Sequence, residues 1–167
     1  MLIRLATAGD WPAIWSILEP IFRAGETYAL PRDISESAAK TFWLGPDRTV
    51  FVAEADDGVL GTAFVHPNQQ GGGAHVANCA FATSEAARGR GIARALCAYT
   101  IDHCRIAGFN AIQFNFVVST NEAALHLWHS FGFDVLARLP KAFDHPTLGL
   151  VDALVMWKTL SETVESE

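Results

Sequence analysis

The sequence predicts an α+β fold: a mixed, mostly antiparallel sheet with helices on both of its faces. Apolar residues recur at helical spacing in some segments and form strand-like runs in others. The triplet Asp56-Asp57-Gly58 lies between two strand-like runs and is a hairpin signal. Over residues 75–107 a strand-like run, a glycine-containing loop and a helix-like run follow one another.

Before the hairpin turn, the chain is predicted to form a strand, two helices and another strand. The first strand covers residues 2–6, and a helix follows from Asp10, its candidate N-cap, to about Arg23. Residues 24–33 have no clean period and contain glycine and proline, so we expect a loop that faces a binding site. Ser35 is the expected N-cap of a short second helix.

From residue 50 onward, strands outnumber helices. The predicted strands are residues 50–55, 59–65, 75–83, 111–118, 133–137 and 151–157. The predicted helices are residues 92–107, which Gly108 ends, and 121–131, which Gly132 ends. These elements form a single predicted domain over residues 2–158, and the acidic segment 159–167 is expected to fray.

Composition excludes several classes of function. The 18 acidic residues exceed the 12 basic ones, so a nucleic-acid partner is not expected, since that affinity rests on Lys and Arg. The N-terminus lacks a signal-peptide pattern, and no apolar run is long enough to span a bilayer. Cys79, Cys97 and Cys104 have no metal-binding spacing. We therefore expect a cytoplasmic protein that uses no metal and binds no membrane.

The stretch Arg88-Gly89-Arg90-Gly91-Ile92-Ala93 is the strongest functional signal. A glycine loop before a helix presents main-chain N–H groups and the positive end of the helix dipole, which together suit a pyrophosphate. A mononucleotide P-loop would need Lys and Ser or Thr after Gly91, where Ile92 and Ala93 stand. The dinucleotide fingerprint would need a glycine where Arg94 stands, and an acid after the next strand.

The same stretch resembles the R/Q-x-x-G-x-G/A motif of the GCN5-related N-acetyltransferases, the GNAT family. Ile3 to Thr7 with Asp10 resembles the opening strand and first helix of that family. A second family motif is matched by Asn121, Ala124, Leu127 and the Gly132-Phe133 pair. The order of elements agrees over about residues 2–158. Residues 114–121 and 25–28 are also similar to branches that act on free amino acids, proline analogues and phosphinothricin.

The resemblance implies acetyl-CoA as cofactor, bound where the strands at 75–83 and 111–118 splay into a V. It implies main-chain contacts from Phe81, Ala82 and Thr83, and contact of Asn121 with the cofactor arm. The residues implied for the pyrophosphate are Arg88, Gly89, Arg90, Gly91, Ile92 and Ala93. Trp128 stands where the family often has a tyrosine as general acid; an indole cannot serve as an acid, so we expect Trp128 to pack against cofactor or core.

Candidates for the chemistry itself come from polar residues near the expected V and from the loop at 24–33. Asn78 and Asn115 are polar positions within otherwise apolar strands, and we expect them to bind the substrate or to polarise the thioester. Tyr28 is the candidate proton donor. Glu26 is a candidate for attracting an ammonium group or acting as base, or else an exposed loop acid. His145 is expected to close the pocket, or else to be a surface histidine.

The predicted activity is therefore acetyl-CoA-dependent N-acetylation of a small-molecule amine, by direct attack in a ternary complex. Two alternatives stay open at this stage. One is acetylation of a protein or peptide, and the other is an acyl-CoA-binding domain without turnover. The resemblance also implies a possible homodimer.

Overall fold

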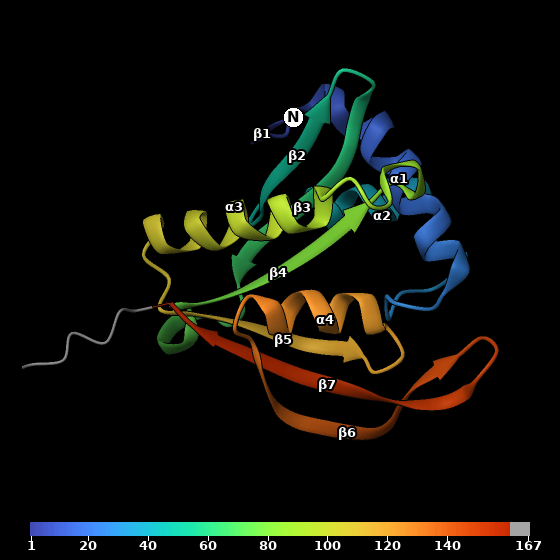
Figure 1. Ribbon diagram of the computed structural model, residues 1–167, viewed down its shortest axis with the longest axis vertical. Coiled ribbons are helices and arrows are strands. Elements are labelled where there is room, and N and C mark those ends of the chain that lie inside the picture. The colour runs from blue at the N-terminus through green and yellow to red at the C-terminus, as the bar shows by residue number, and fades with distance from the viewer. Residues whose placement is uncertain (161–167) are drawn as a thin grey trace, which may run out of the picture.

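Seven strands form one sheet in the order β1-β2-β3-β4-β5-β7-β6 (Figure 1). The computed structural model describes residues 1–160. The strands are β1 (Leu2–Leu5), β2 (Thr49–Ala55), β3 (Gly58–Pro67), β4 (Val76–Thr83), β5 (Ala111–Val118), β6 (Asp134–His145) and β7 (Gly149–Thr159). The helices are α1 (Trp11–Ala24), α2 (Glu36–Trp43), α3 (Ile92–Ile106) and α4 (Glu122–Ser130). Short 3₁₀ turns lie at Ala8–Asp10, Gly71–Gly73 and Glu85–Ala87.

Neighbouring strands are antiparallel except for β4 and β5, which are parallel. The parallel pair is joined through α3, which crosses one face of the sheet. This arrangement confirms the predicted α+β class with a mixed, mostly antiparallel sheet.

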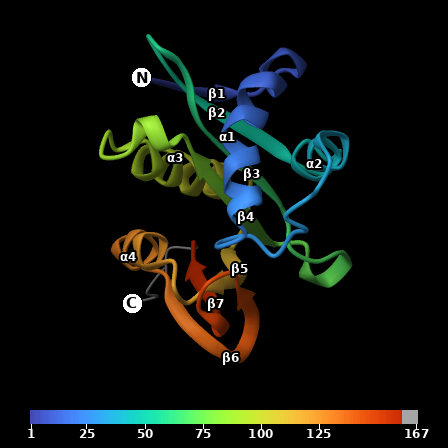
Figure 2. The ribbon, with the colours of Figure 1, turned by 90° about the vertical axis from the view of Figure 1, so that its right-hand side faces the viewer.

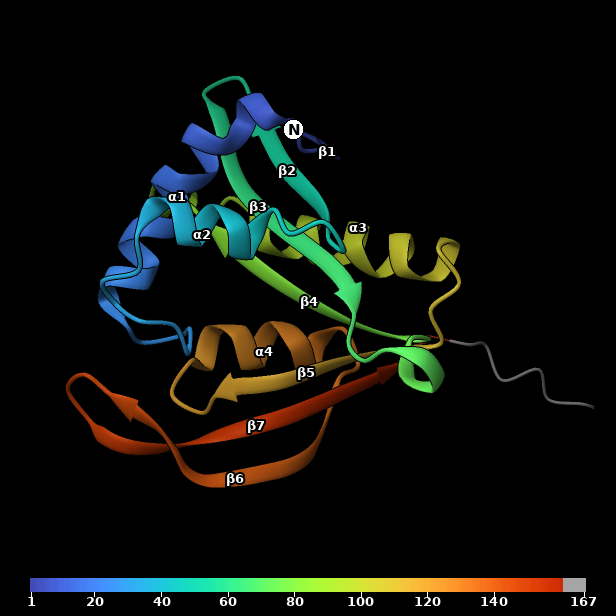
Figure 3. The same cartoon turned by 180° about the vertical axis from the view of Figure 1, so that it is seen from behind.

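The helices cover both faces of the sheet, as predicted. α1 and α2 lie over one face, where Ile14, Leu18 and Trp43 pack against Val52 and Phe64 (Figure 3). α3 and α4 lie over the other face, as the turned view also shows (Figure 2). No helix within residues 1–160 is long and apolar enough to cross a membrane.

An ion pair ties the first strand to the start of the first helix. The Arg4 guanidinium donates to both carboxylate oxygens of Asp10, over 2.8 and 2.9 Å, and Nε donates to Glu54 on β2 over 2.9 Å. Asp10 also accepts from the main-chain N–H of Thr7 over 2.7 Å. Arg4 therefore holds the pKa of the Asp10 carboxyl well below its usual range. Asp10 precedes α1 as expected, but its side chain folds back to Thr7 and does not cap α1.

The C-terminal hairpin is longer than predicted. β6 and β7 extend over residues expected to be loop, because their mutual pairing overrides a sequence that lacks alternation there. Register shifts between Val135 and Ala137 and between Leu139 and Phe143 break the alternation. The described chain also extends past the predicted boundary at 158: Thr159 pairs with Ala111, and Leu160 is buried. The remainder of the predicted tail, 161–167, lies outside the described residues.

Replacement of Asp10 by Asn is expected to destabilise the fold. The amide cannot pair with Arg4 as a carboxylate does, and loss of a charged hydrogen bond costs about 2 kcal/mol. For a chain of this size that cost corresponds to a fall in Tm of about 4–8 °C. Thermal unfolding followed by circular dichroism measures it.

The difference between the wild type and Asp10→Asn should depend on pH. A carboxyl whose folded pKa is depressed contributes stability above its unfolded pKa of about 3.9, and the contribution is lost as pH falls below that value. The gap in Tm should be constant from pH 6 to 8 and shrink below about pH 4. Asp102→Asn, in an exposed pair with Arg105, is the control and should change Tm little.

Candidate functional site

β4 and β5 separate after only two residue pairs. Val76 pairs with Ala111 and Ala77 with Ile112, and no further pair joins these strands within the described chain. Figure 1 shows the strands together where they begin and apart at their C-terminal ends. A register shift in β5 between Phe114 and Val117 bends the strand at the opening. The predicted V-shaped splay is therefore present.

The register of β4 decides which main-chain groups face the gap. Asn68 N–H donates to the carbonyl of Val76, and Ser84 N–H donates to the carbonyl of Leu60, both over 2.8 Å. Since bonding alternates along an antiparallel pair, the even-numbered residues of β4 direct their main chain to β3. Phe81 and Thr83 therefore direct theirs into the gap.

Ala82 is a correction to the sequence prediction. It pairs with Thr62, so its main-chain groups belong to the β3 side of the strand. Ala82 nevertheless lines both cavities described below. Phe81 and Thr83 remain the candidates for main-chain contact with a ligand in the gap.

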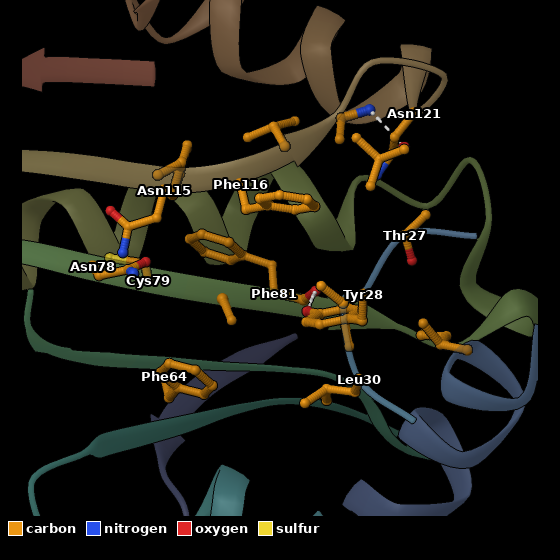
Figure 4. A pocket seen from close by; sticks show the side chains of 18 of the residues that line it. Thr27, Tyr28, Leu30, Phe64, Asn78, Cys79, Phe81, Asn115, Phe116 and Asn121 are labelled. Carbon is orange, nitrogen blue, oxygen red and sulfur yellow. Dashed lines mark hydrogen bonds between the residues drawn. The ribbon is translucent and has the colours of Figure 1, made fainter. Parts of the chain in front are cut away.

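Tyr28 reaches into the gap from the loop between α1 and α2. Its hydroxyl donates to the Phe81 carbonyl over 2.6 Å, as Figure 4 shows. Its ring packs edge-on against Phe22 and Trp43. Burial raises the pKa of the Tyr28 hydroxyl above its ordinary value. A phenol made less acidic in this way is a poor proton donor, which argues against the predicted general acid and favours a positioning role.

A cavity of about 620 Å³ opens beside the gap on the face that α1 and α2 cover (Figure 4). Its lining combines apolar side chains with a few polar ones, among them Thr27, Tyr28, Arg48, His66, Asn78 and Asn115. This size and mixture are typical of a site for a small molecule. None of its described lining residues is an aspartate or glutamate.

A second cavity, of about 200 Å³, lies between α4 and the start of α3. Five residues line both cavities: Phe81, Ala82, Thr83, Ala124 and Trp128. The two cavities therefore meet at the gap between β4 and β5. A ligand that approaches along the α3–α4 face can meet one that approaches from the α1–α2 face.

The glycine loop leads into the second cavity. Gly89 and Gly91 have φ of 77° and 76°, and the space where their Cβ atoms would stand is open. In residues 1–160, no main-chain acceptor pairs with the N–H groups of the loop glycines or of the first turn of α3. Open N–H groups at the N-terminus of a 15-residue helix are the geometry that binds phosphate.

The two loop arginines are not equally available. Arg90 donates to both carboxylate oxygens of Asp57, over 2.7 and 3.2 Å, in the β2–β3 turn. Arg88 is exposed and makes a longer contact, 3.3 Å, with Glu85. The main chain of the loop therefore offers the open donors, and of the two side chains Arg88 is the less firmly held.

Asn121 immediately precedes α4, and Trp128 lies within that helix. The Asn121 side chain accepts from the N–H of Ala124 over 3.4 Å and caps the helix, and it also lines the larger cavity. Trp128 is buried, with ring centroids 5.0 Å from Phe81 and 4.8 Å from Phe114. This aromatic packing fills the α4 side of the gap.

Asn78 and Asn115 are brought together from the two sides of the gap. Both donate to the side-chain oxygen of Asn68, over 3.3 and 2.7 Å. Gln113 donates in turn to Asn115 over 3.0 Å. These four amides bridge β4 and β5 just beyond their last pair. Sequence reasoning missed Asn68 and Gln113, because no local pattern shows that a turn residue meets both strands.

Glu26 and His145 do not belong to the site. Glu26 is exposed and does not line either cavity. His145 is buried in the β6–β7 turn, where its Nδ1 accepts from the N–H groups of Thr147 and Leu148. The structure therefore places both residues away from the cavities: the loop turns Tyr28 inward and leaves Glu26 exposed, the alternative kept for it above, and His145 stabilises a turn.

Arg48 and His66 line the larger cavity and were not predicted. Each adjoins a strand otherwise rich in apolar residues, which is the only signal the sequence offers for them. Burial and the charge of Arg48 lower the pKa of His66, so its imidazole is neutral near pH 7.

Cys79 points into the core on the opposite face, as expected, and burial raises the pKa of its thiol.

The chain resembles known proteins over most of its length. The model of the Acetyltransferase (GNAT) family matches residues 11–133. A GCN5-related N-acetyltransferase from Kribbella flavida is 47% identical, with a TM-score of 0.91 and coverage of 95% of this chain and 97% of that one.

Two further solved structures are more distant. A ribosomal-protein-alanine N-acetyltransferase from Brucella melitensis is 26% identical, with a TM-score of 0.84 and coverage of 96% and 100%. The structure of yncA from Salmonella typhimurium, which holds its cofactor acetyl-CoA, is 25% identical, with a TM-score of 0.81 and coverage of 100% and 98%.

Replacement of Tyr28 by Phe is expected to loosen the loop between α1 and α2. The Phe81 carbonyl loses its donor, which costs about 1 kcal/mol in stability and frees the loop from β4. Hydrogen exchange should show faster exchange in residues 25–35, and Tm should fall by about 2–4 °C. Tyr99→Phe, on the exposed side of α3, is the control. Unchanged exchange in the loop would show that the hydroxyl does not hold it.

Proposed function

The chain belongs to the GNAT family and is an acetyl-CoA-dependent N-acetyltransferase, and on that premise we propose that its acceptor is the amine of a small molecule, such as a free amino acid or an analogue. The observation that carries the proposal is the 620 Å³ cavity on the face opposite the glycine loop. Its volume lies in the range of sites for small ligands, and most of its lining residues are apolar.

The donor side of the site fits the cofactor of the family. The open N–H groups of residues 89 and 91–94 and the dipole of α3 suit the pyrophosphate. We assign the pantetheine arm to the main chain of Phe81 and Thr83 and to Asn121, which lie along the gap. Bound there, acetyl-CoA supplies an acetyl group activated as a thioester.

The acceptor side favours direct attack by the amine. Cys79 is the one cysteine among the described lining residues, but its thiol is buried in the core on the opposite face with its pKa raised, so it is a poor nucleophile. Asn78 and Asn115 offer polar groups at the base of the gap, where they bind the acceptor in this proposal. His66 is neutral near pH 7 and can accept a proton, so we assign it the proton released by the amine.

Two alternatives differ in what they predict for turnover. A protein or peptide acceptor is favoured by the name of the Brucella melitensis neighbour. A binding domain without turnover is favoured by the tryptophan at position 128, where the family often has a tyrosine. We retain a homodimer and a cytoplasmic location as predictions, and sedimentation velocity tests the first.

One assay separates these possibilities. Purified protein is mixed with acetyl-CoA and, in separate reactions, with free amino acids, simple amines and peptides, and thiol release is followed. We expect release with small amines. Release only with peptides would refute the small-molecule acceptor, and no release with any amine would support the binding domain.

The combined change Arg88→Ala and Gly91→Glu is expected to abolish binding of coenzyme A. The glutamate places a negative charge in the open space over the loop, and the alanine removes the more available arginine. Isothermal titration calorimetry should show affinity reduced by at least about 100-fold. The control Arg105→Ala, on the far end of α3, should bind as the wild type does. Intact binding in the double variant would disprove the assignment of the loop.

A further inference from the structure

Arg48 occupies an unusual place in the larger cavity. It lies between α2 and β2, and its guanidinium stacks over two aromatic rings, 4.4 Å from the centroid of Phe42 and 4.1 Å from that of Phe64. Only 14% of its side chain is exposed. The two rings hold the planar group in one position, so its forked donors are preorganised.

The guanidinium of Arg48 lacks the partners that a buried charge requires. Within residues 1–160 it donates no hydrogen bond, and its Nη1 is buried without a partner. Its nearest carboxylate is Asp47, whose side chain is 63% exposed and stands 3.8 Å from Nε, beyond hydrogen-bond distance. Burying such a cation is costly unless an anion pairs with it. Burial accordingly lowers the pKa of Arg48.

The sheet register connects Arg48 to the gap. Thr49 pairs with Val65, so the preceding residue, Arg48, falls beside His66, and His66 pairs with Asn78 on β4. These three side chains share the face that lines the cavity. Neighbouring strands are about 4.8 Å apart, so the main chains of Arg48, His66 and Asn78 form a row across β2, β3 and β4. This row spans about 10 Å from Arg48 to the edge of the gap.

The cavity carries charge of one sign. Among its described lining residues Arg48 is the one permanently charged side chain, and there is no carboxylate to receive an ammonium group. His66 is neutral near pH 7. Such a cavity disfavours cationic acceptors such as polyamines or lysine-rich peptides, and favours a molecule that brings an anion of its own.

We propose that Arg48 binds the carboxylate of the acceptor, so that the substrate is a free amino acid or a close analogue whose amine lies at the gap beside Asn78. The inference rests on the proposed function and names the residue that selects the substrate class. A carboxylate matches the fork of a guanidinium with two parallel hydrogen bonds and satisfies the open Nη1. The two aromatic rings beside the guanidinium exclude water from the pair and strengthen it.

The test compares matched acceptors. For each of the 20 common amino acids, the free acid, its carboxamide and the decarboxylated amine are assayed with acetyl-CoA, and kcat and KM are measured for the best series. We expect the free acid to exceed its carboxamide in kcat/KM by about 100-fold, the effect of a buried charge pair. Deaminated acids of the same series should inhibit competitively against the amine.

The variant Arg48→Met keeps the stacking volume and removes the charge. It should lose about 100-fold in kcat/KM for the free acid, mostly through KM, and should change the carboxamide by less than about threefold. Arg48→Lys should fall between, because it keeps the charge without the fork. Arg105→Met, in an exposed pair with Asp102, is the control and should retain full discrimination.

The outcomes distinguish the role of Arg48 in carboxylate binding from the proposed small-molecule acetyltransferase function. A wild type that acetylates carboxamides or plain amines as well as free acids overturns the role of Arg48 and leaves the small-molecule acetyltransferase standing. A wild type that acetylates no amine while still binding coenzyme A overturns the proposed function itself. If Arg48→Met does not fold, the wild-type comparison and the inhibition by deaminated acids decide the matter alone.

Discussion

The early separation of β4 and β5 is the constraint on which the rest of the structure depends. After two residue pairs, each strand presents main-chain groups without a partner strand, and unpaired buried groups cost free energy. The fold offsets this cost with side chains from distant elements. Tyr28 donates to the carbonyl of Phe81, Trp128 packs against the α4 side of the gap, and amides bridge its base. The main-chain groups in the gap that remain unpaired are available to a ligand.

The same gap explains how two substrates can meet within one sheet. A closed sheet would separate its two faces, whereas here a cavity on each face reaches the shared residues Phe81, Thr83 and Trp128. Both cavities are electropositive, by different means. The donor side uses main-chain N–H groups and the dipole of α3, and the acceptor side uses the Arg48 guanidinium. The chain carries a net charge of −6, so these positive sites are local features.

Local patterns in the sequence describe the local geometry of the donor side more directly than that of the acceptor side, for a physical reason. The glycine loop and the Asn121 cap depend on residues within a few positions of one another, so the sequence displays them directly. The acceptor side depends on register between β2, β3 and β4 and on the path of an irregular loop. The strand register and the path of the loop determine that Tyr28 points into the cavity while Glu26 points to solvent. No short sequence pattern encodes either of them. The length of the β6–β7 hairpin was underestimated for a similar reason, because long-range pairing overrides a broken alternation.

The absence of a carboxylate among the described cavity residues changes how the amine must lose its proton. In a free amino acid the neighbouring carboxylate stabilises the ammonium form, which is unreactive. If Arg48 pairs with that carboxylate, the stabilisation is largely neutralised, and the ammonium also lies in a site that carries no other anion. The pKa of the substrate ammonium must then fall. The neutral His66 therefore needs to accept only a weakly held proton. Substrate selection and amine activation would thus come from one interaction, with no carboxylate base required in the cavity wall.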